Sequence, residues 1–599
     1  MTAADGNRLS ELAKRRGFFF PANEPYGGTA GFYVYGPQGA ALKRNIEDAW
    51  RDRFAVGEGN VEIVSPTVMP EPVFLASGHL DGFDDMLVEC PECGESHRAD
   101  HLVEAATAVE DAEALAPEAI ASLLAEHDIQ CPRCGSALAG EPVEEFNLMF
   151  ETAIGPGGGS PGYLRPETAQ GIFVEFPRLK EYAREQLPFG VTQIGPAYRN
   201  EISPRRGLVR LREFTQAELE VFIDPERDEP PIDRVADVSL PLYAAPDQQD
   251  EDGDVVEMTV TAALENDVIA SDWIAYYLGL AIDWYERIGI DRSRFRFRQH
   301  LAGERAHYAA DCWDAEAEVD GNWIEVTGFA YRSDYDLGKH DEHADDDYTV
   351  FRQYDEPVTR EVVSVDPDMS VLGPEYGSAA AGIADALRRL AEEDPAAFET
   401  GDVVELDADA VDADLDAETV SVARSAVGYA REEETVTGEH LIPHVIEPSF
   451  GIDRLVYAVL DHRLDRDEVD DEERRVLRLP PETAPTTVGV FPLMDRDGLG
   501  ERARAVRDRL RRHGLAVAYD DSGSIGRRYR RQDEVGTPYC VTVDYETLET
   551  ETVTVRDRDT ATQRRVDLET LPTTLMSLTA GEVAFEDVGS AVLEQGPDA

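Results

Sequence analysis

The chain has 599 residues and a formal net charge of −66, because 122 aspartate and glutamate side chains oppose 56 lysine and arginine side chains. A hydrophobic content of 42%, with 22 phenylalanine and 22 tyrosine residues, can build several packed cores and argues against a disordered acidic protein. Only four basic residues are lysines, which is typical of a surface adapted to molar salt, where a Debye length of about 3 Å screens repulsion among carboxylates.

The N-terminal segment, residues 1–20, has no secretory signal, and no run approaches the ~18 apolar residues of a membrane span. We therefore expect a cytoplasmic protein of an extreme halophile, without a membrane or DNA partner.

The first expected elements are a short basic helix over residues 8–20, a longer helix over residues 39–54, and a strand that ends at Pro66. The longer helix presents an apolar packing face made of Leu42, Ile46, Ala49, Trp50 and Phe54.

Two similar knuckles, Cys90-Pro-Glu-Cys93-Gly and Cys131-Pro-Arg-Cys134-Gly, each place two thiolates around a tight turn. Paired CxxC motifs supply the four ligands that a tetrahedral zinc ion takes, and a reducing compartment suits a metal site better than disulfides. We expect a zinc-ribbon-like insertion over residues 88–140, interrupted by an acidic helical segment. Reduced cysteines without a metal are the alternative.

Residues 193–222 predict a hairpin with its turn at 203–207. Because side chains alternate along a strand, Arg199 and Glu201 should share a face of the first strand. One face of the second strand should carry six polar or aromatic side chains, Arg210, Arg212, Phe214, Gln216, Glu218 and Glu220. Cations, a ring and carboxylates on one surface indicate a nucleotide site.

The segments after this hairpin differ in character. Residues 224–256 are acidic and proline-rich and predict a surface excursion, whereas residues 340–440 predict an acidic, largely solvated insertion without catalytic residues. Residues 444–462, HVIEPSFGIDRLVYAVLDH, predict a strand that runs into a helix. Glu447, Ser449 and Gly451 share one strand face, and Asp453 and Arg454 enter the helix.

From about Ala484 strands and helices alternate, which predicts a small, largely parallel α/β domain. Arg527, Arg528, Arg530 and Arg531 form a basic cluster there, where nucleic-acid phosphates are expected to bind.

Several of these stretches resemble the class II aminoacyl-tRNA synthetases. Arg199-x-Glu201, a turn and Arg210-x-x-x-Phe214 resemble motif 2, and the run RNEISPRRGLVRLREFTQAELEVF resembles glycyl-tRNA synthetase of the homodimeric type. The helix, strand and proline before residue 66 resemble motif 1, the dimer interface of that class, and residues 444–462 resemble motif 3. The run GSIGRRYRRQDEVGTPYC resembles the anticodon-binding domain of class IIa synthetases.

The resemblance implies an α/β (α+β) protein, with an antiparallel-sheet catalytic domain over 1–483, containing the insertions 88–140 and 340–440, and an anticodon-binding domain over 484–599. It implies ATP-dependent activation of glycine with Mg²⁺, transfer to the 3′ end of tRNA(Gly), and a homodimer. The implied catalytic residues are Arg199, Glu201, Arg210, Phe214, Glu325 and Arg454. The implied ATP site adds Asn200, Val209, Leu211, Arg212, Glu213, Val326, Gly451, Ile452 and Asp453. The implied glycine site comprises Arg98, Glu167, Phe214, Thr215, Gln216, Ala217, Glu218, Glu447, Pro448, Ser449, Phe450 and Gly451.

Two alternatives remain. Another class IIa synthetase, for proline, threonine or histidine, is disfavoured by the runs YGPQGAALKRNI, RPETAQG and AHYAADCWD. A catalytically silent synthetase-like binding protein is disfavoured because Arg199, Arg210, Phe214 and Arg454 are all present.

Overall fold

The computed structural model describes residues 3–107, 109, 112, 115–204, 207–250, 253–301, 311–398, 401–407, 410–411, 419–469 and 472–592. Arg205 and Arg206 of the expected turn, and residues 306–310 of the run AHYAADCWD, lie outside the described residues. The chain forms two compact units, one of Met1–Tyr348 with Ile442–Ala599 and one of Thr349–Leu441.

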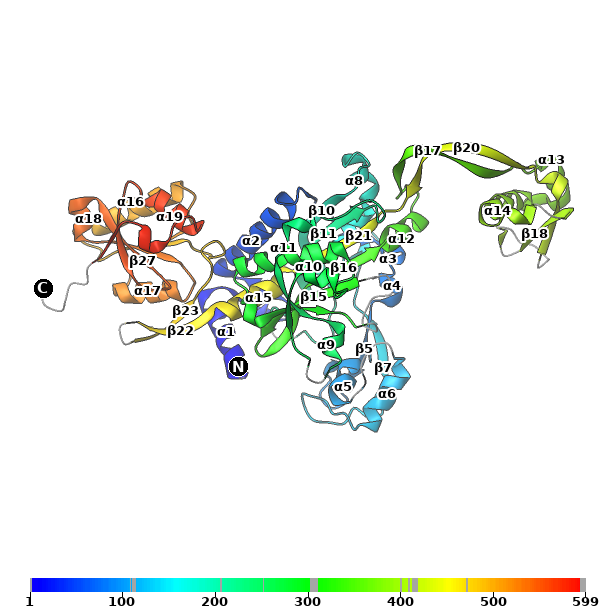
Figure 1. Ribbon diagram of the computed structural model, residues 1–599. Helices are drawn as coiled ribbons and strands as arrows, with labels where there is room; N and C mark the ends of the chain where they lie inside the picture. The colour runs from blue at the N-terminus through cyan, green and yellow to red at the C-terminus, as the bar shows by residue number, and fades with distance from the viewer. Residues whose placement is uncertain are drawn as a thin grey trace. The chain divides into compact units, whose positions relative to one another are not determined.

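A nine-stranded sheet is the centre of the first unit (Figure 1). Neighbouring strands are antiparallel except for the parallel pairs β12–β14 and β3–β10. The strand order is β13 (Val256–Thr259), β12 (Ser239–Tyr243), β14 (Phe295–Gln299), β15 (Asp311–Val319), β16 (Asn322–Ser333), β21 (His444–Gly451), β11 (Glu213–Ile223), β10 (Phe189–Tyr198) and β3 (Val61–Glu62).

Three helices, α2 (Pro37–Trp50), α11 (Asp272–Ile288) and α15 (Ile452–Arg463), share the main hydrophobic core with this sheet (Figure 1). The expected packing face of the 39–54 helix is confirmed, since all five of its apolar side chains are buried. Phe450 of β21 lies among aromatic rings of this core, 4.8 Å from the ring centroid of Phe54 and 5.3 Å from that of Trp284.

The motif 2 hairpin differs from its prediction. Strand β10 ends at Tyr198 and β11 begins at Glu213, so Arg199, Glu201, Arg210 and Arg212 lie in the connection and not on paired strands. Buried Leu208 and Leu211 draw this connection into the core, and the Arg212 guanidinium donates to the carbonyls of Glu201 and Ala30. These contacts satisfy backbone groups that a strand ladder would otherwise pair.

Two further expectations were wrong. Residues 224–256 are not only a surface excursion, because they contain β12, whose Leu240 and Leu242 are buried in the core. The strand expected up to Pro66 ends at Glu62, at the edge of the sheet, and the next backbone amide, of Ile63, donates to the Thr192 carbonyl.

The cysteine knuckles lie in loops beside a small three-stranded sheet of order β6 (Ser96–Arg98), β5 (Asp84–Glu89) and β7 (Val143–Asn147). Helices α5 (Ala99–Ala106) and α6 (Pro117–Glu126) lie between the knuckles in sequence and share a separate core with this sheet.

The second unit has its own core. A long antiparallel ribbon of β17 (Val350–Val365) and β20 (Tyr429–Leu441) connects to a small subdomain of α13 (Met369–Tyr376), α14 (Ala380–Glu393), β18 (Val403–Asp407) and β19 (Thr419–Ala423) (Figure 1).

The C-terminal part contains a six-stranded sheet of order β25 (Val517–Tyr519), β24 (Val488–Pro492), β26 (Tyr539–Val543), β27 (Thr552–Asp557), β28 (Gln563–Asp567) and β29 (Ser590–Ala591). Only β25, β24 and β26 pair in parallel, so the sheet is mixed and not largely parallel. Helices α16 (Leu499–Arg512), α17 (Ile525–Asp533) and α19 (Leu571–Thr579) accompany it. None of the helices within the described residues is long and apolar enough to span a membrane.

Candidate active site

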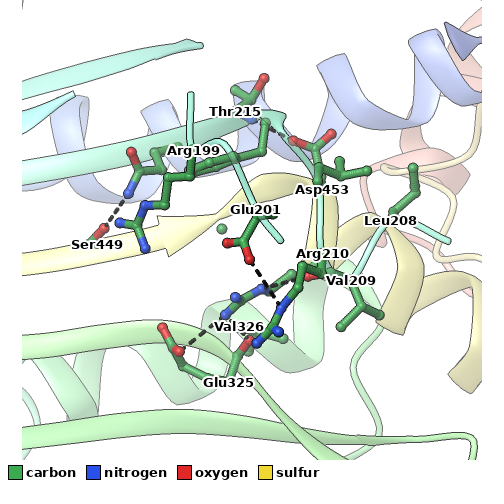
Figure 2. A pocket seen from close by; sticks show the side chains of 15 residues that line it. Arg199, Glu201, Leu208, Val209, Arg210, Thr215, Glu325, Val326, Ser449 and Asp453 are labelled. Atoms are coloured by element: carbon green, nitrogen blue, oxygen red, sulfur yellow. Dashed lines mark hydrogen bonds and ion pairs between the residues drawn. The ribbon is translucent and has the colours of Figure 1, made fainter. Parts of the chain in front are cut away.

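A pocket opens where β11, β16, β21 and the 199–212 connection meet (Figure 2). It brings together most of the residues that the sequence assigns to ATP. Its lining is Arg199, Glu201, Leu208, Val209, Arg210, Leu211, Phe214, Thr215, Gln216, Glu325, Val326, Ser449, Gly451, Asp453 and Arg454.

The Arg199 guanidinium lies between two aromatic rings. Its central carbon is 5.5 Å from the ring centroid of Phe214 and 5.3 Å from that of Phe83. Cation–π contacts on both sides fix a long side chain with a delocalised charge, so Arg199 is held in place at the pocket. Phe83 was missed from the sequence, because an isolated phenylalanine carries no motif.

Two cation–carboxylate pairs also line the pocket (Figure 2). Arg210 is 3.6 Å from Glu201, and Arg454 is 3.1 Å from the Glu325 carboxylate. Burial raises the pKa of Glu325, but the Arg454 charge and hydrogen bond outweigh burial and the net shift is downward. Glu325 is therefore an ionised carboxylate beside an arginine.

Asp453 is buried, and its carboxylate accepts hydrogen bonds from three different segments. The partners are the backbone N–H of Thr215 at 2.5 Å, Lys43 Nζ at 2.9 Å and the hydroxyl of Tyr35. With these partners Asp453 acts as a structural link at the wall of the pocket. Lys43 and Tyr35 were missed, although Lys43 is one of only four lysines in the chain.

A cluster of buried carboxylates, here named the recess, adjoins the pocket at Ser449. Ser449 Oγ donates to Glu218 Oε1 at 2.8 Å, and Thr168 Oγ1 donates to the other Glu218 oxygen. Gln216 connects the two regions, since its side-chain amide lies 3.4 Å from Ser449 Oγ. Burial, followed by the Glu167 charge, raises the pKa of Glu218.

Glu447 and Glu220 extend the recess. Burial raises the pKa of Glu447 to about 8, against the opposing charge of Arg332, which lies 2.9 Å away. Glu220 is fully buried, and among the residues that the structure describes neither of its carboxylate oxygens has a hydrogen-bond partner. Burial raises the pKa of Glu220 well above the usual range. Glu220 was not assigned to the site from the sequence, although it shares a strand face with Glu218.

Glu167 lies near the same recess, 3.5 Å from His79 Nε2, and accepts a hydrogen bond from Gln170 at 2.9 Å. Burial raises its pKa, but the charges of His79 and Arg332 reverse the shift. The neighbouring Arg165 is buried and donates to Pro196 O and Ser65 Oγ. These hydrogen bonds hold the segment that carries Glu167 against β10 and the residues after β3.

Most of the other assigned residues lie outside the pocket lining. The side chains of Ala217, Phe450, Ile452 and Leu211 belong to the hydrophobic core, where Leu211 also borders the pocket. Pro448 is buried, Glu213 is exposed, and the Asn200 N–H donates to Leu148 O.

Arg98 has two carboxylate partners. It pairs with Asp85 at 3.0 Å and donates through Nε to Asp100 at 3.1 Å. Burial raises the pKa of Asp85 to about 6, and Arg98 opposes this shift. Arg98 is thus positioned by its own acidic neighbours, next to the Ser96 carbonyl that accepts a hydrogen bond from Ser203 of the 199–212 connection.

The four knuckle cysteines converge. Their sulfur atoms all lie within 4.8 Å of one another, with Cys90 and Cys134 3.5 Å apart and Cys93 and Cys131 3.7 Å apart. Zinc–sulfur bonds of ~2.3 Å in a tetrahedron require sulfur atoms ~3.8 Å apart, so the cluster fits zinc.

The expected arginine cluster of α17 is only partly available. Arg528 is buried and donates to the carbonyls of Pro492, Asp521 and Gly523, so it stabilises the loop that precedes α17. Arg530 pairs with Glu472 and Arg531 with Asp520, whereas Arg527 is exposed. The prediction that all four arginines face phosphates was wrong for Arg528.

Known proteins resemble the chain over its full length. Residues 159–238 match the family described as "tRNA synthetase class II core domain (G, H, P, S and T)", and residues 487–578 match "Anticodon binding domain". A protein of Methanothrix thermoacetophila named glycine–tRNA ligase is 51% identical over 98% of this chain and 99% of its own length. Proteins of the same name from Methanothermobacter thermautotrophicus and Archaeoglobus fulgidus are each 46% identical, over 96% and 97% of this chain and 100% and 98% of their own lengths.

Proposed function

We propose, from the premise that this chain belongs to the glycine–tRNA ligase family, that it activates glycine with ATP and transfers it to the 3′ end of tRNA(Gly). One observation carries the proposal: a pocket with three arginines and an aromatic ring adjoins a recess lined by carboxylates. The pocket suits a nucleoside triphosphate, and the recess suits a small compound with an ammonium group.

In the first step an oxygen of the glycine carboxylate bonds to the α-phosphorus of ATP, while the bond from that phosphorus to pyrophosphate breaks. Positioning and electrostatic stabilisation dominate such transfers. We assign Arg199 to the α-phosphate and the glycine carboxylate, and Arg210 and Arg454 to the outer phosphates. Phe214 would stack on adenine, and Glu201 would bind near the adenine amino group.

Glu325 is our candidate for the magnesium ion that accompanies ATP. Mg²⁺ prefers hard oxygen ligands and commonly uses one or two carboxylates together with phosphate oxygens. The ionised Glu325 carboxylate lies beside Arg454, where the outer phosphates would bind.

Glycine has no side chain, so its selection must combine recognition of the ammonium group with exclusion of bulk at Cα. We assign Glu167, Glu218 and Glu447 to the ammonium, with Ser449 closing the recess. A bound ammonium would favour the charged forms of Glu218 and Glu447, whose pKa values burial raises. A rigid recess excludes alanine because overpacking costs more than one methyl group can gain.

In the second step glycine passes from the adenylate to the 3′ hydroxyl of tRNA, and AMP leaves. We assign residues 1–483 to activation and transfer, and residues 484–599 to anticodon binding. The match of residues 487–578 to an anticodon-binding domain supports the second assignment. The protein would act in the cytoplasm, where tRNA is charged.

We expect Arg199→Ala to lower glycine-dependent ATP–pyrophosphate exchange about 10²- to 10³-fold, because it removes a charge that acts on the transition state. Arg388→Ala is the matched control, since its side chain is 52% exposed and pairs with Asp385 in the second unit. Exchange in molar KCl measures both variants. Near-normal exchange by folded Arg199→Ala would refute the assigned role.

We propose that the four cysteines bind one structural zinc ion. Metal analysis of protein purified without added zinc should give about one zinc per chain. Chelation should lower the unfolding midpoint, because metal binding contributes to folding. Cys134→Ser should behave like the chelated protein. Metal-free protein whose stability is indifferent to chelators would exclude the site.

We propose a homodimer through the region that resembles motif 1. The edge strand β3 and α8 (Phe176–Tyr182) border an apolar groove, and Val64 and Tyr182 there are 87% and 74% exposed. Light scattering in molar KCl should give twice the chain mass of 66.2 kDa, and Tyr182→Glu should lower it. A wild-type monomer would contradict the dimer.

We propose that the acidic surface is an adaptation to molar salt. At ~0.1 M salt the Debye length is about 10 Å and neighbouring carboxylates repel one another, whereas at ~1 M it falls to about 3 Å. The unfolding midpoint measured by circular dichroism should therefore rise from 0.1 to 3 M KCl. A flat or falling midpoint would contradict the adaptation and leave the enzymatic proposal intact.

A further inference from the structure

A groove rich in arginine lies between α1 (Ala3–Arg16), the hairpin of β22 (Leu464–Val469) and β23 (Glu472–Leu477), and α17. Its lining is Arg15, Arg466, Glu473, Arg474, Arg475, Arg530 and Glu534. Five cations therefore face two carboxylates, although acidic side chains outnumber basic ones 122 to 56 in the whole chain. The local charge is opposite in sign to that of the protein.

The arginines of the groove have different tasks. Arg474 is buried and bonds to Asp467 and Asp533, so it ties the hairpin to α17 and shapes the groove. Asp533 also bonds to Arg556 of the C-terminal sheet at 2.9 Å, which extends this tie into the domain behind α17. Arg474 therefore positions the groove and is not itself available to a ligand.

Of the other four cations, Arg530 pairs with Glu472, whereas Arg15, Arg466 and Arg475 are under-compensated. Arg15 and Arg16 share the single carboxylate of Glu534. Arg466 pairs with Glu473 across the hairpin, and both side chains are more than 40% exposed, so this pair contributes little and can exchange partners. Arg475 has no ion-pair partner among the residues that the structure describes.

We propose that this groove binds the phosphate backbone of tRNA, between the part held by the C-terminal domain and the 3′ end at the catalytic pocket. The proposal rests on the proposed function. Guanidinium groups match phosphate geometry and keep their charge in every condition, which suits a row of backbone phosphates. The groove is bordered by α1, whose Leu9 and Ala13 belong to the catalytic core, and by α17 of the C-terminal domain. A tRNA that engages both parts must cross this junction.

The test uses Arg475→Glu and Arg15→Glu in the full-length protein, with Arg388→Glu as control. Arg388 is 52% exposed in the second unit and pairs with Asp385, so its reversal changes the net charge equally at a residue that is not part of the groove lining. The dissociation constant for tRNA and the KM for tRNA are measured in a series of KCl concentrations. Glycine-dependent pyrophosphate exchange, which needs no tRNA, reports the catalytic pocket.

Each groove variant should raise the KM and dissociation constant for tRNA about threefold to tenfold, because it removes a phosphate contact together with the counterion release that the contact drives. The slope of log affinity on log KCl should fall by about one for each lost contact. Exchange and the control variant should be unchanged. Added inorganic phosphate should not compete with tRNA for binding at concentrations that leave ATP–pyrophosphate exchange unchanged.

If both groove variants keep the wild-type tRNA affinity and salt slope, the proposal that the groove binds tRNA is wrong. Normal charging of tRNA with glycine by the wild-type protein would still support the proposed function. Wild-type protein that exchanges no pyrophosphate with glycine would overturn the proposed function instead. If Arg475→Glu loses exchange through misfolding, Arg475→Gln and Arg15→Gln decide the question by the same salt slope. Competition by phosphate alone, without any effect on tRNA, would show a small-anion site and overturn the proposal.

Discussion

The buried carboxylate of Asp453 holds the catalytic pocket together. It connects the start of α15 to β11 through the Thr215 amide, to α2 through Lys43, and to β2 (Tyr33–Tyr35) through the Tyr35 hydroxyl. Removing one partner of a buried, hydrogen-bonded charge leaves the other uncompensated, which is strongly destabilising. The position of Arg454, the next residue on α15, therefore depends on contacts with three segments that are distant in the sequence.

The pocket and the recess differ in the charge that they offer a ligand: the pocket offers arginines, and the recess offers carboxyl groups. In the pocket, Arg199 is held between two rings and Arg454 lies beside an ionised Glu325, so positive charge is fixed before a polyanion binds. In the recess, several buried carboxyls share one Arg332, and burial raises the pKa values of Glu218, Glu220 and Glu447. A cation entering the recess gains from both the unpaired oxygens and the relief of mutual repulsion.

Hydrophobic periodicity and short motifs predicted those parts of the site whose structure depends on neighbouring residues in the sequence. The buried face of α2 and the junction of β21 with α15 follow from periodicity and from one strand-to-helix transition. Within the connection 199–212, the residues on either side of the expected turn at 203–207 were predicted as paired strand, because alternation continues through them. Burial of Leu208 and Leu211 removes this connection from the sheet. Phe83, Tyr35 and Lys43 reach the site only through tertiary packing, and the burial of Arg528 depends on carbonyls of Pro492, Asp521 and Gly523 that no spacing reveals.

The place of β21 in the sheet has a consequence for the order of synthesis. This strand inserts between β16 and β11, yet it is translated long after both, because the whole second unit intervenes in the sequence. At ribosomal rates of ~5–20 residues per second, β11 waits roughly 10–45 s for its neighbour. During that interval the facing edges of β11 and β16 present unpaired backbone groups, the kind of edge that invites wrong pairing. The central sheet of the nascent chain therefore lacks the strand between β11 and β16 until residues 444–451 emerge. The second unit has its own hydrophobic core, so it can fold during this interval without pairing with the two open strand edges.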